Sequence, residues 1–282
     1  MKKLSVSQQK TLINALCERF TADFSVFTPL LIRNVHLGFV NTEFARLLRR
    51  DLTHHLRPCS GCLNIQADTW LQAADLLEST ARDWHNAGFY DGWRGEKFDV
   101  SSPEGEVLFA LERSAFRVLG FLSHAIHING YIQKNDEYLF WVGRRSPFKA
   151  VDPDKLDNLT GGGIASGETA HQAMMREGFE EAGLPENLLR NIKENGRRLS
   201  LRSVHRGLHR EWLHLFDVLL PEKFTPENQD GEVSSFCLMT ADEIVQAIAD
   251  GCFMNDAALA VTATFIRLGL MPDAPELNFQ AA

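Results

Sequence analysis

GGIASGETAHQAMMREGFEEAGL, residues 162–184, is the stretch of this chain that decides its fold. It places Glu177, Glu180 and Glu181 at positions i, i+3 and i+4 of a predicted helix, so three carboxylates lie over one arc of its surface. Like charges at this spacing repel one another, and the C-terminal end of a helix disfavours anions. Because hard divalent cations such as Mg²⁺ prefer carboxylate oxygens, the pattern predicts a metal site.

The predicted helix has clear ends. Thr169 and Gln172 fit a capping box, and Gly183-Leu-Pro185 is a strong stop signal. Upstream, the glycine-rich segment Leu159–Gly167 lets backbone carbonyls approach a ligand or an ion closely. The apolar side chains opposite the glutamates are expected to pack against a core, and they are Met175, Phe179 and Ala182. A solvated charged helix is the alternative, but no lysines alternate with these glutamates.

The segment resembles the Nudix box, G-x5-E-x7-R-E-U-x-E-E-x-G-U, in which U is a bulky apolar residue. The matching positions are Gly162, Glu168, Arg176, Glu177, Glu180, Glu181, Gly183 and Leu184. Gly178 departs from the motif, because an aliphatic residue is usual there. Glycine inside a helix costs about 1 kcal/mol relative to alanine, although it permits the close approach of a neighbouring segment. The resemblance implies an α/β fold, the Nudix α/β/α sandwich with a mixed sheet, and an ion pair between Arg176 and Glu168.

The resemblance also assigns roles to the acidic residues. Glu177 and Glu181 are the expected metal ligands, with Glu180 a third candidate and the Gly162 carbonyl completing the shell. The expected ion is Mg²⁺, with Mn²⁺ as a substitute, and a water polarised by the metal would attack a diphosphate. Glu232 follows a turn at the start of a strand, where Nudix enzymes often place another carboxylate. Glu232 and Glu180 are therefore rival general bases, and an ordinary strand-edge role for Glu232 is equally compatible with the sequence.

Four residues of two apolar strands are candidates for substrate binding. Arg144 and Arg145 must point to opposite faces, so one can bind phosphate while the other forms a structural ion pair. His127 and Tyr131 share a face and could border a substrate pocket, although core positions are their commoner role. The basic residues between positions 202 and 210 are interpreted either as an anion-attracting rim or as a solvated loop.

Residues 1–120 are predicted to form a smaller α/β domain that sets substrate selectivity, and residues 121–282 the Nudix domain. In the first of these, Trp93 with Phe89 and Tyr90 could stack on a heteroaromatic ring, or could simply belong to the core. Periodicity predicts helices at Ser7–Phe20, Glu43–Arg49, Asp68–Ala87, Glu112–Leu122, Ala241–Asp250 and Asp256–Leu268. Strands are predicted at Val35–Val40, Trp93–Val100, Ala125–Gln133, Glu137–Gly143, Arg197–Arg206, Glu211–Leu219 and Glu232–Leu238.

Composition narrows the class of protein. The 282 residues are 44% hydrophobic with a net charge of −8, which argues against a nucleic-acid or membrane-surface binder. No apolar run reaches the ~20 residues needed to cross a bilayer, and the N-terminus lacks a secretory apolar segment, so a cytoplasmic protein is expected. Five cysteines fit free thiols. Cys59 and Cys62, with His54 and His55 upstream, invite a zinc or redox interpretation, but a turn with two unlinked thiols is favoured.

Further segments narrow the resemblance to one Nudix subfamily, over about residues 20–270. They are Gly92–Val100, Leu111–Ala115, His127–Tyr131, Arg144–Ser146 and Leu156–Asn158. They look like the subfamily that includes the Nudix portion of some fungal thiamine pyrophosphokinases. This implies hydrolysis of thiamine diphosphate, or of its oxy- and oxo- analogues, to the monophosphate. A hydrolase of ADP-ribose-like compounds and a non-catalytic ligand-sensing module remain alternatives. The expected partner is a small diphosphate, with no nucleic acid or membrane, and the oligomeric state stays open.

Overall fold

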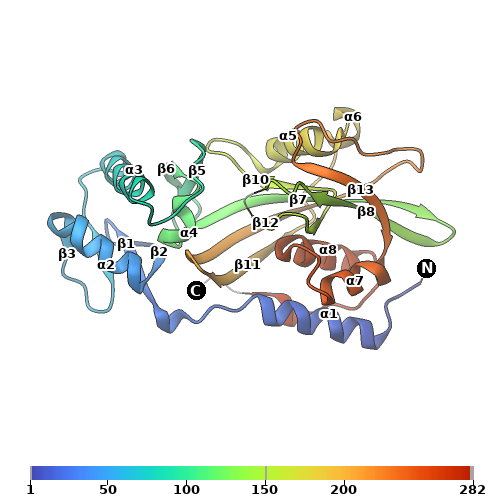
Figure 1. Cartoon of the computed structure of the whole chain (residues 1–282), viewed down its shortest axis with the longest axis horizontal. Helices are drawn as coiled ribbons and strands as arrows, with labels where there is room; N and C mark the ends of the chain where they lie inside the picture. The colour runs from blue at the N-terminus through green and yellow to red at the C-terminus, as the bar shows by residue number, and fades with distance from the viewer. Residues whose placement is uncertain (1, 150, 280–282) are drawn as a thin grey trace.

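The computed structural model describes residues 2–149 and 151–279. Its centre is a seven-stranded mixed sheet in the order β11-β12-β7-β8-β13, with β10 beside β7 and β9 beside β8 (Figure 1). β7 and β12 run parallel, whereas the other pairings of this sheet are antiparallel. The strands are β7 (Leu122–Lys134), β8 (Glu137–Arg145), β9 (Leu156–Asp157), β10 (Thr160–Gly163), β11 (Arg197–Val204), β12 (Gly207–Leu219) and β13 (Val233–Thr240).

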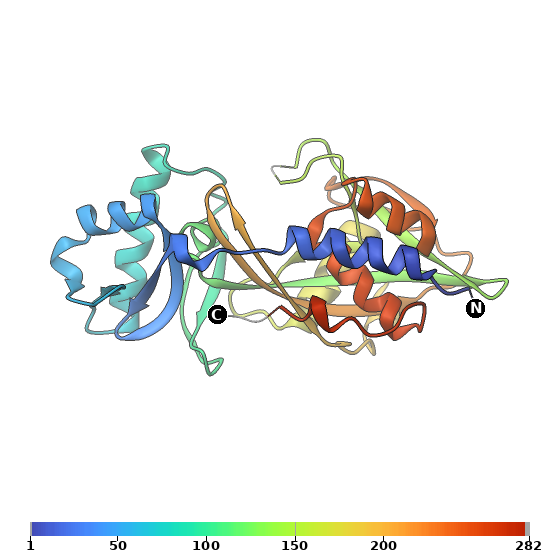
Figure 2. The same ribbon diagram turned by 90° about the horizontal axis from the view of Figure 1, so that it is seen from below.

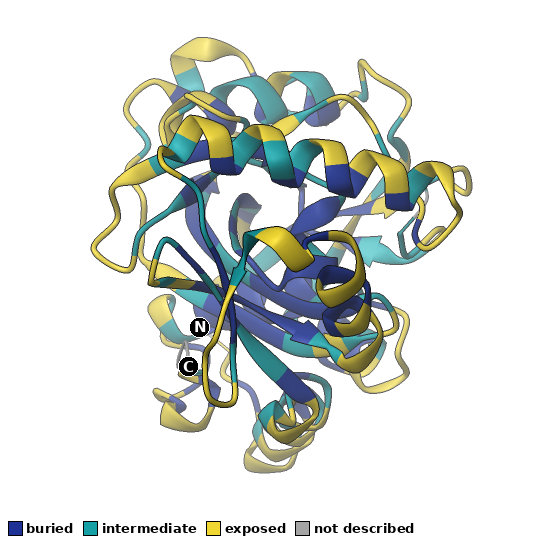
Figure 3. Cartoon of the chain, turned by 90° about the vertical axis from the view of Figure 1, so that its left-hand side faces the viewer, coloured by how far each residue is buried: buried dark blue, intermediate teal, exposed yellow. Residues whose placement is uncertain are grey.

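Helices cover both faces of this sheet. One face carries α5 (Ala170–Ala182) and α6 (Glu186–Leu189), and the other carries α1 (Val6–Arg19), α7 (Ala241–Ala249) and α8 (Asn255–Arg267). Alternation along β7 supplies both cores, since Ile126 and Ile128 pack on the α5 side and Ala125 packs on the α8 side. The central strands β7 and β12 are accordingly mostly buried, while the helices expose their outer faces (Figure 3). The expected α/β/α sandwich with a mixed sheet is confirmed.

The N-terminal part forms a second core around a four-stranded sheet in the order β2-β1-β4-β3. Three helices and a separate hairpin pack on it. Its strands are β1 (Phe27–Ile32), β2 (Val35–Asn41), β3 (Leu56–Arg57) and β4 (Leu63–Ile65), and the hairpin consists of β5 (Lys97–Ser101) and β6 (Val107–Glu112). Its helices are α2 (Thr42–Asp51), α3 (Trp70–Asn86) and α4 (Ala115–Leu119), and the 3-10 turns of the chain are η1 (Phe24–Val26), η2 (Thr53–His55) and η3 (Pro275–Leu277).

The first helix does not belong to this second core. Leu12 and Leu16 of α1 are fully buried with Ile248 of α7 and Phe265 of α8. Figure 2 shows α1 lying along the same side of the molecule as these helices. The division of the chain at residue 120 stays a prediction, and α1 packs with the larger unit.

Two predicted elements differ from the structure, and the strands β1, β3, β4, β6, β9 and β10 were not predicted. The helix expected at Glu112–Leu122 is confined to Ala115–Leu119, because Gly120 ends it with φ 62°. The extended segment expected from Trp93 begins only at Lys97. β1 contains Pro29, but it pairs with β4 only from Leu30, so the missing N–H of Pro29 costs no ladder bond on that side.

The cysteine prediction was wrong. Cys59 and Cys62 are joined by a disulfide in the turn between β3 and β4, with their Cα atoms 5.4 Å apart. Gly61 adopts φ 71° between them, which lets the chain reverse tightly enough to bring the two side chains together. A spacing of three residues is compatible with both thiols and a disulfide, so the sequence did not separate these states. Among the described residues, no helix is both long and apolar enough to cross a membrane.

A pair of histidines links β7 to β12 and makes stability depend on pH. His124 Nδ1 lies 2.9 Å from His214 Nε2. Burial and the neighbouring His214 lower the pKa of His124 from 6.5 to about 4. Between pH 6.5 and pH 4, His124 binds a proton in the unfolded chain but stays neutral in the folded chain. The free energy of unfolding should therefore fall as the pH drops from 6.5 to 4, by roughly 3 kcal/mol for this group, with no contribution above that window.

Urea unfolding of the His124→Gln variant across this pH range tests the expectation. The variant should lose stability less steeply than the parent chain, because glutamine does not titrate. His171 is exposed on α5 and serves as the control, since its ring remains in water in both states, so His171→Gln should leave the slope unchanged. An identical slope in His124→Gln and the parent would refute this role.

Candidate active site

The predicted Nudix helix is α5, and its ends form as expected. Thr169 and Gln172 make a complete capping box, and Gly183 closes the helix with φ 62°. The backbone N–H groups of Gly183 and Leu184 donate back into the last turn. These caps fix where the helix starts and stops, and thereby where its glutamates lie.

The position of Gly178 explains how α5 is oriented. A Cβ atom built there would lie 2.7 Å from Leu189 Cδ1 and 3.2 Å from Ile128 Cδ1. The absence of a side chain therefore lets α5 approach β7 and α6 closely. The helix is also turned from the predicted orientation, since Phe179 is 58% exposed whereas Glu181 is 4% exposed. The glutamate face points partly into the protein.

Filling this contact should destabilise the fold. Gly178→Val should lower the free energy of unfolding by about 1–3 kcal/mol, because overpacking outweighs the small gain in helix propensity. Urea unfolding measures the change. Adding Leu189→Ala should recover part of the loss by removing the clashing methyl group, which a double-mutant cycle reports as coupling. A Gly178→Val variant as stable as the parent would contradict this packing argument.

Glu181 is the most constrained carboxylate of the site. It accepts hydrogen bonds from Thr160 Oγ1 at 2.7 Å and from the Gly161 N–H at 3.0 Å, both in β10. Lys149 Nζ lies 3.2 Å from its other oxygen. Burial raises the pKa of Glu181, and the Lys149 ammonium works against that rise. A carboxylate held in this way is costly unless cations offset it.

Glu177 is a second buried carboxylate next to the glycine strand. Its Oε1 would lie 2.0 Å from a Cβ atom on Gly162, so only glycine leaves room for it. Burial and the negative charge of Glu181 together raise the pKa of Glu177 to about 7, although Arg176 opposes both. Hard oxygen donors that repel one another in a buried place fit a divalent cation, so the residues present are compatible with the metal that the box implies.

Arg176 fastens the helix to the preceding loop. Its Nε and Nη2 each lie 2.9 Å from the two oxygens of Glu168, and its Nη1 lies 2.7 Å from Glu177 Oε1. The pKa of Glu168 is lowered by Arg176 even though burial acts in the opposite sense. The Arg176–Glu168 ion pair implied by the box is present, and it holds the loop over the helix.

A further acidic group comes from the turn before β13. Oxygens of Glu181, Asp230 and Glu232 lie within 4.8 Å of one another. Lys149 also contacts Glu232, and this contact lowers the Glu232 pKa against the effect of burial. Glu180, the rival base, is 44% exposed and lies 3.4 Å from Arg176. Lys149 was not predicted, because nothing in the sequence marks a single lysine in a loop as a contact of two distant glutamates.

Most of these groups line a cavity of about 290 Å³ between the two units; Glu181 and Glu168 lie behind its lining. Its floor includes Ala125 and His127 of β7 with the glycines of β10, and its far side comes from the N-terminal part. That part contributes side chains that no expectation had placed here, namely Arg94, Glu96, Phe98, Arg113 and Arg117. Both units therefore contribute side chains to the cavity lining.

Two of the five predicted substrate-binding residues line the cavity. His127 Nδ1 lies 2.7 Å from Asn158 Oδ1, and Arg145 Nη1 lies 2.7 Å from Asp157 Oδ2. Both side chains are thereby held in place by partners in and beside β9. Arg144 points away and donates to the Asp154 carbonyl at 2.8 Å, so Arg145 lies in the cavity and also forms the ion pair.

The other two predicted residues, Tyr131 and Trp93, do not line this cavity. Tyr131 packs against Tyr138 and Phe140, with ring centroids 5.3 and 5.8 Å apart, because four residues of strand carry it roughly 13 Å beyond His127. Trp93 stacks on His85 at 5.7 Å and lies under Arg82, so it belongs to the N-terminal core. The aromatic side chain that reaches the cavity is Phe98.

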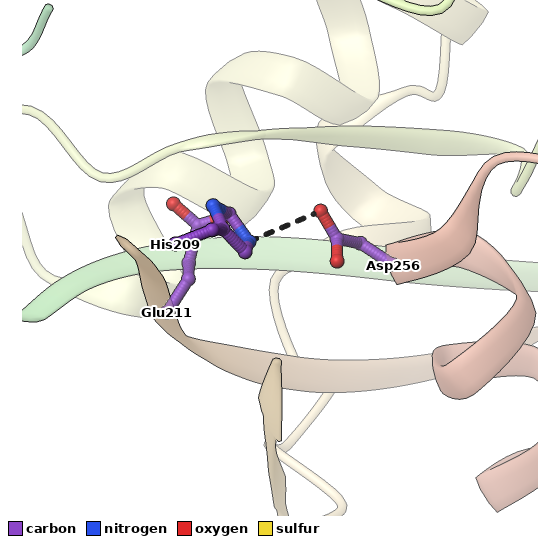
Figure 4. Close-up of side chains that lie close together, drawn as sticks. All are labelled: His209, Glu211 and Asp256. Carbon is purple, nitrogen blue, oxygen red and sulfur yellow. Dashed lines mark ion pairs between the residues drawn. The ribbon is translucent and has the colours of Figure 1, made fainter. Parts of the chain in front are cut away.

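A second polar cluster lies where β12 meets α8. Figure 4 shows Asp256 pointing from α8 toward His209, with Glu211 alongside. Asp256 is held 2.6 Å from Arg202 Nη1 and 3.2 Å from Nη2, and these contacts keep the Asp256 pKa well below its usual value although burial acts against them. Because a guanidinium already occupies this carboxylate, we interpret the cluster as an ion-pair network rather than a metal site.

The basic residues of β11 and β12 therefore differ from both expectations. Arg202, His209 and Arg210 are buried in the hairpin, so they form neither a rim nor a solvated loop. Arg210 donates to the Gly120 carbonyl at 3.0 Å, and burial lowers its pKa to about 10. At the hairpin turn His205 is exposed, as a solvated loop residue would be, and Arg206 reaches outward to Asp91.

Comparison with known proteins identifies the family. The family model described as NUDIX domain matches residues 124–256. The Arabidopsis thaliana protein called Nudix hydrolase 24, chloroplastic, is 30% identical over 92% of this chain and 73% of its own. The chain belongs to the Nudix hydrolase family. This confirms the expectation of a Nudix hydrolase enzyme, and the match to the plant relative extends across the N-terminal part that the NUDIX model leaves out.

Two other proteins are similar to this Nudix chain. An uncharacterised protein of Saccharomyces cerevisiae is 31% identical over 77% of this chain and 68% of its own. A Deinococcus radiodurans protein of known crystal structure aligns with a TM-score of 0.46 and 23% identity, covering 60% of this chain and 98% of that one.

Proposed function

We propose that this Nudix chain is a Mg²⁺- or Mn²⁺-dependent hydrolase of a diphosphate linkage. The observation that carries the proposal is the pair of buried carboxylates, Glu177 and Glu181, packed against the glycine backbone of β10 at one end of a cavity. Such a pair requires compensating cations, and only Lys149 and Arg176 contact them among residues 2–149 and 151–279. Every acidic position of the Nudix box is present in this chain, and this argues against a non-catalytic sensing module.

Glu177, Glu181 and the Gly162 carbonyl would hold the ion, with Glu180 at its exposed side. The ion would neutralise phosphate charge and make a bound water acidic. Glu232, anionic at neutral pH because its pKa is lowered, would accept the proton of the attacking water. The water oxygen bonds to one phosphorus as the bridging P–O bond breaks, so the products are a monophosphate and phosphate.

Lys149 is a positioning residue in this scheme. Its ammonium contacts both Glu181 and Glu232, and therefore sets the separation between a metal ligand and the base. Arg145, fixed by Asp157, adds positive charge to the cavity wall where a phosphate oxygen would lie. We favour Glu232 over Glu180 as the base, because its oxygens cluster with those of Glu181 and Asp230, whereas Glu180 contacts Arg176.

We propose thiamine diphosphate or an oxy- or oxo- analogue as the substrate. The support is that every segment carrying the subfamily resemblance reaches this cavity. Arg94, Phe98, Arg113, His127 and Arg145 line it from four of the segments, and the fifth supplies Asp157 and Asn158, the partners of Arg145 and His127. Phe98 is the phenyl ring of this lining, although it is 6% exposed and Arg113 lies over its ring. An ADP-ribose-like substrate is the alternative, and we propose a cytoplasmic location.

One assay separates these possibilities. The purified chain with Mg²⁺, and separately with Mn²⁺, is offered thiamine diphosphate, its oxy- and oxo- analogues, ADP-ribose and a dinucleoside polyphosphate at equal concentration. Highest kcat/KM on a thiamine compound supports the proposal. Preferential turnover of ADP-ribose would reject the thiamine substrate while retaining the reaction class, and turnover of none would favour the sensing module.

A further inference from the structure

The loop between α3 and β5 brings an arginine to the rim of the cavity. Arg94 lines the cavity, yet its guanidinium makes no hydrogen bond or ion pair with any residue in the described parts of the chain. The other basic side chains at the carboxylate end are engaged, since Lys149 contacts Glu181, Arg145 contacts Asp157 and Arg176 contacts Glu168. Arg94 is therefore a cation of the cavity whose donors are free.

The backbone of this loop is held by a buried carboxylate. Glu112, at the end of β6, is 1% exposed. Its two oxygens accept from the Arg94 N–H at 3.1 Å and the Gly95 N–H at 2.9 Å. A buried acidic group committed to two consecutive backbone donors fixes their direction, so the base of the Arg94 side chain is well defined.

The loop is also fastened on either side of Arg94. Asp91 accepts from Arg206 at the turn of the β11–β12 hairpin, through its carbonyl and its carboxylate at 2.8 Å each. Glu96 is paired with Arg113, and Gly92 and Gly95 take φ values of 87° and 74° that a side chain would resist. These contacts anchor the loop to both units while leaving the Arg94 guanidinium unengaged.

Arg94 lies close to the reacting end of the cavity. Burial opposes the ionisation of Glu232, but a hydrogen bond from Lys149 and the positive charges of Lys149, Arg94 and Arg145 hold the Glu232 pKa below its ordinary value. The charge of Arg94 is thus felt at the carboxylate that we propose as the base. Trp93, its neighbour in the loop, is anchored in the N-terminal core, which turns the two side chains to different sides.

We propose that Arg94 binds a phosphate oxygen of the substrate, so that the N-terminal unit completes the anion-binding site of the Nudix unit. This rests on the proposed diphosphate substrate. A guanidinium offers paired donors that match the oxygens of a phosphate, and a preorganised loop loses little freedom on binding. Glu112 is the positioning residue that holds the loop. The N-terminal part would then contribute to catalysis as well as to selectivity.

Binding of inorganic pyrophosphate in the presence of Mg²⁺, measured by isothermal titration calorimetry, tests this proposal independently of the organic part of the substrate. Arg94→Ala should weaken binding by about 10- to 100-fold, the range expected when a hydrogen bond between charged groups is lost. Arg144→Ala is the matched control, because Arg144 is an arginine just outside the cavity, and it should bind pyrophosphate as the parent does. The urea midpoint of Arg94→Ala should be unchanged, since its guanidinium forms no hydrogen bond or ion pair within residues 2–149 and 151–279.

Equal pyrophosphate affinity in Arg94→Ala and the parent would overturn the proposal, even if thiamine diphosphate proved to be the substrate. Conversely, an Arg94-dependent loss of pyrophosphate binding would uphold it even if the chain hydrolysed none of the compounds in the panel. Weakening by Arg144→Ala to the same extent as by Arg94→Ala would also overturn it, because the effect would then reflect overall charge. The two proposals therefore fail separately.

Discussion

The Glu181→Gln variant should lose about 10³-fold or more in kcat while remaining folded. Glutamine has the volume of glutamate and can still accept from Thr160 or Gly161, so the packing of α5 against β10 is preserved. It cannot supply the negative charge that a divalent ion needs at this position. Removing an electrostatic interaction made to the transition state in a shielded site costs several kcal/mol of activation free energy, which is equivalent to such a rate loss.

Initial rates on the best substrate of the panel measure the effect, with far-ultraviolet circular dichroism and urea unfolding to establish that the variant is folded. Glu186→Gln is the control, because Glu186 is an exposed glutamate of the adjacent α6 that pairs only with Arg190 in the described structure. It should have the parent kcat. Parent-like rates in Glu181→Gln would mean that the box is not the catalytic centre of this chain.

Local features of the site were predictable because their causes are local. The capping box of Thr169 and Gln172, the helix end at Gly183 and the Arg176–Glu168 pair all join residues at most eight positions apart. Backbone geometry and side-chain reach over one or two turns determine such contacts. The strands and closing helices of the Nudix unit were also placed within a few residues, since hydrophobic periodicity marks them.

What the sequence did not disclose depends on contacts between distant segments. Lys149 acquires its role only where the loop after β8 meets α5 and the turn before β13, 32 and 83 positions further along the chain. The role proposed for Arg94 depends on Glu112, which holds its backbone, and on the packing of the two units around one cavity. Tyr131 shared the correct face with His127, but distance along the strand removed it from the cavity. Periodicity gives the direction of a side chain, whereas the extent of a cavity depends on which segments close it.

The buried polar network of β11 and α8 was overlooked for a related reason. Arg202 and Asp256 are 54 positions apart, and each was assigned to a different category of residue, a basic cluster and a helix start. Their pairing replaces water around both charges, which is unfavourable unless the geometry is good. The two direct contacts, together with Ser200 donating to Asp256 at 2.6 Å, meet that requirement.

Breaking this pair should produce the largest loss of stability among the variants considered. Arg202→Met should lower the free energy of unfolding by about 3–5 kcal/mol, because it leaves Asp256 buried with only Ser200 and His209 as partners. The double variant Arg202→Met/Asp256→Leu should recover most of the loss, since no unpaired charge then remains inside. Urea unfolding of the parent, the two single variants and the double variant gives the coupling energy directly.

The matched control lies on the same strand. Arg197 pairs with Glu194 at 3.4 Å, but its side chain is 54% exposed, so Arg197→Met should cost at most about 1 kcal/mol. If Arg202→Met cost no more than Arg197→Met, the Asp256 carboxylate would have to be neutral or hydrated in the folded chain. The contact between Arg202 and Asp256 would then not be a buried ion pair. In that case the cluster of His209, Glu211 and Asp256 would again be a candidate metal site.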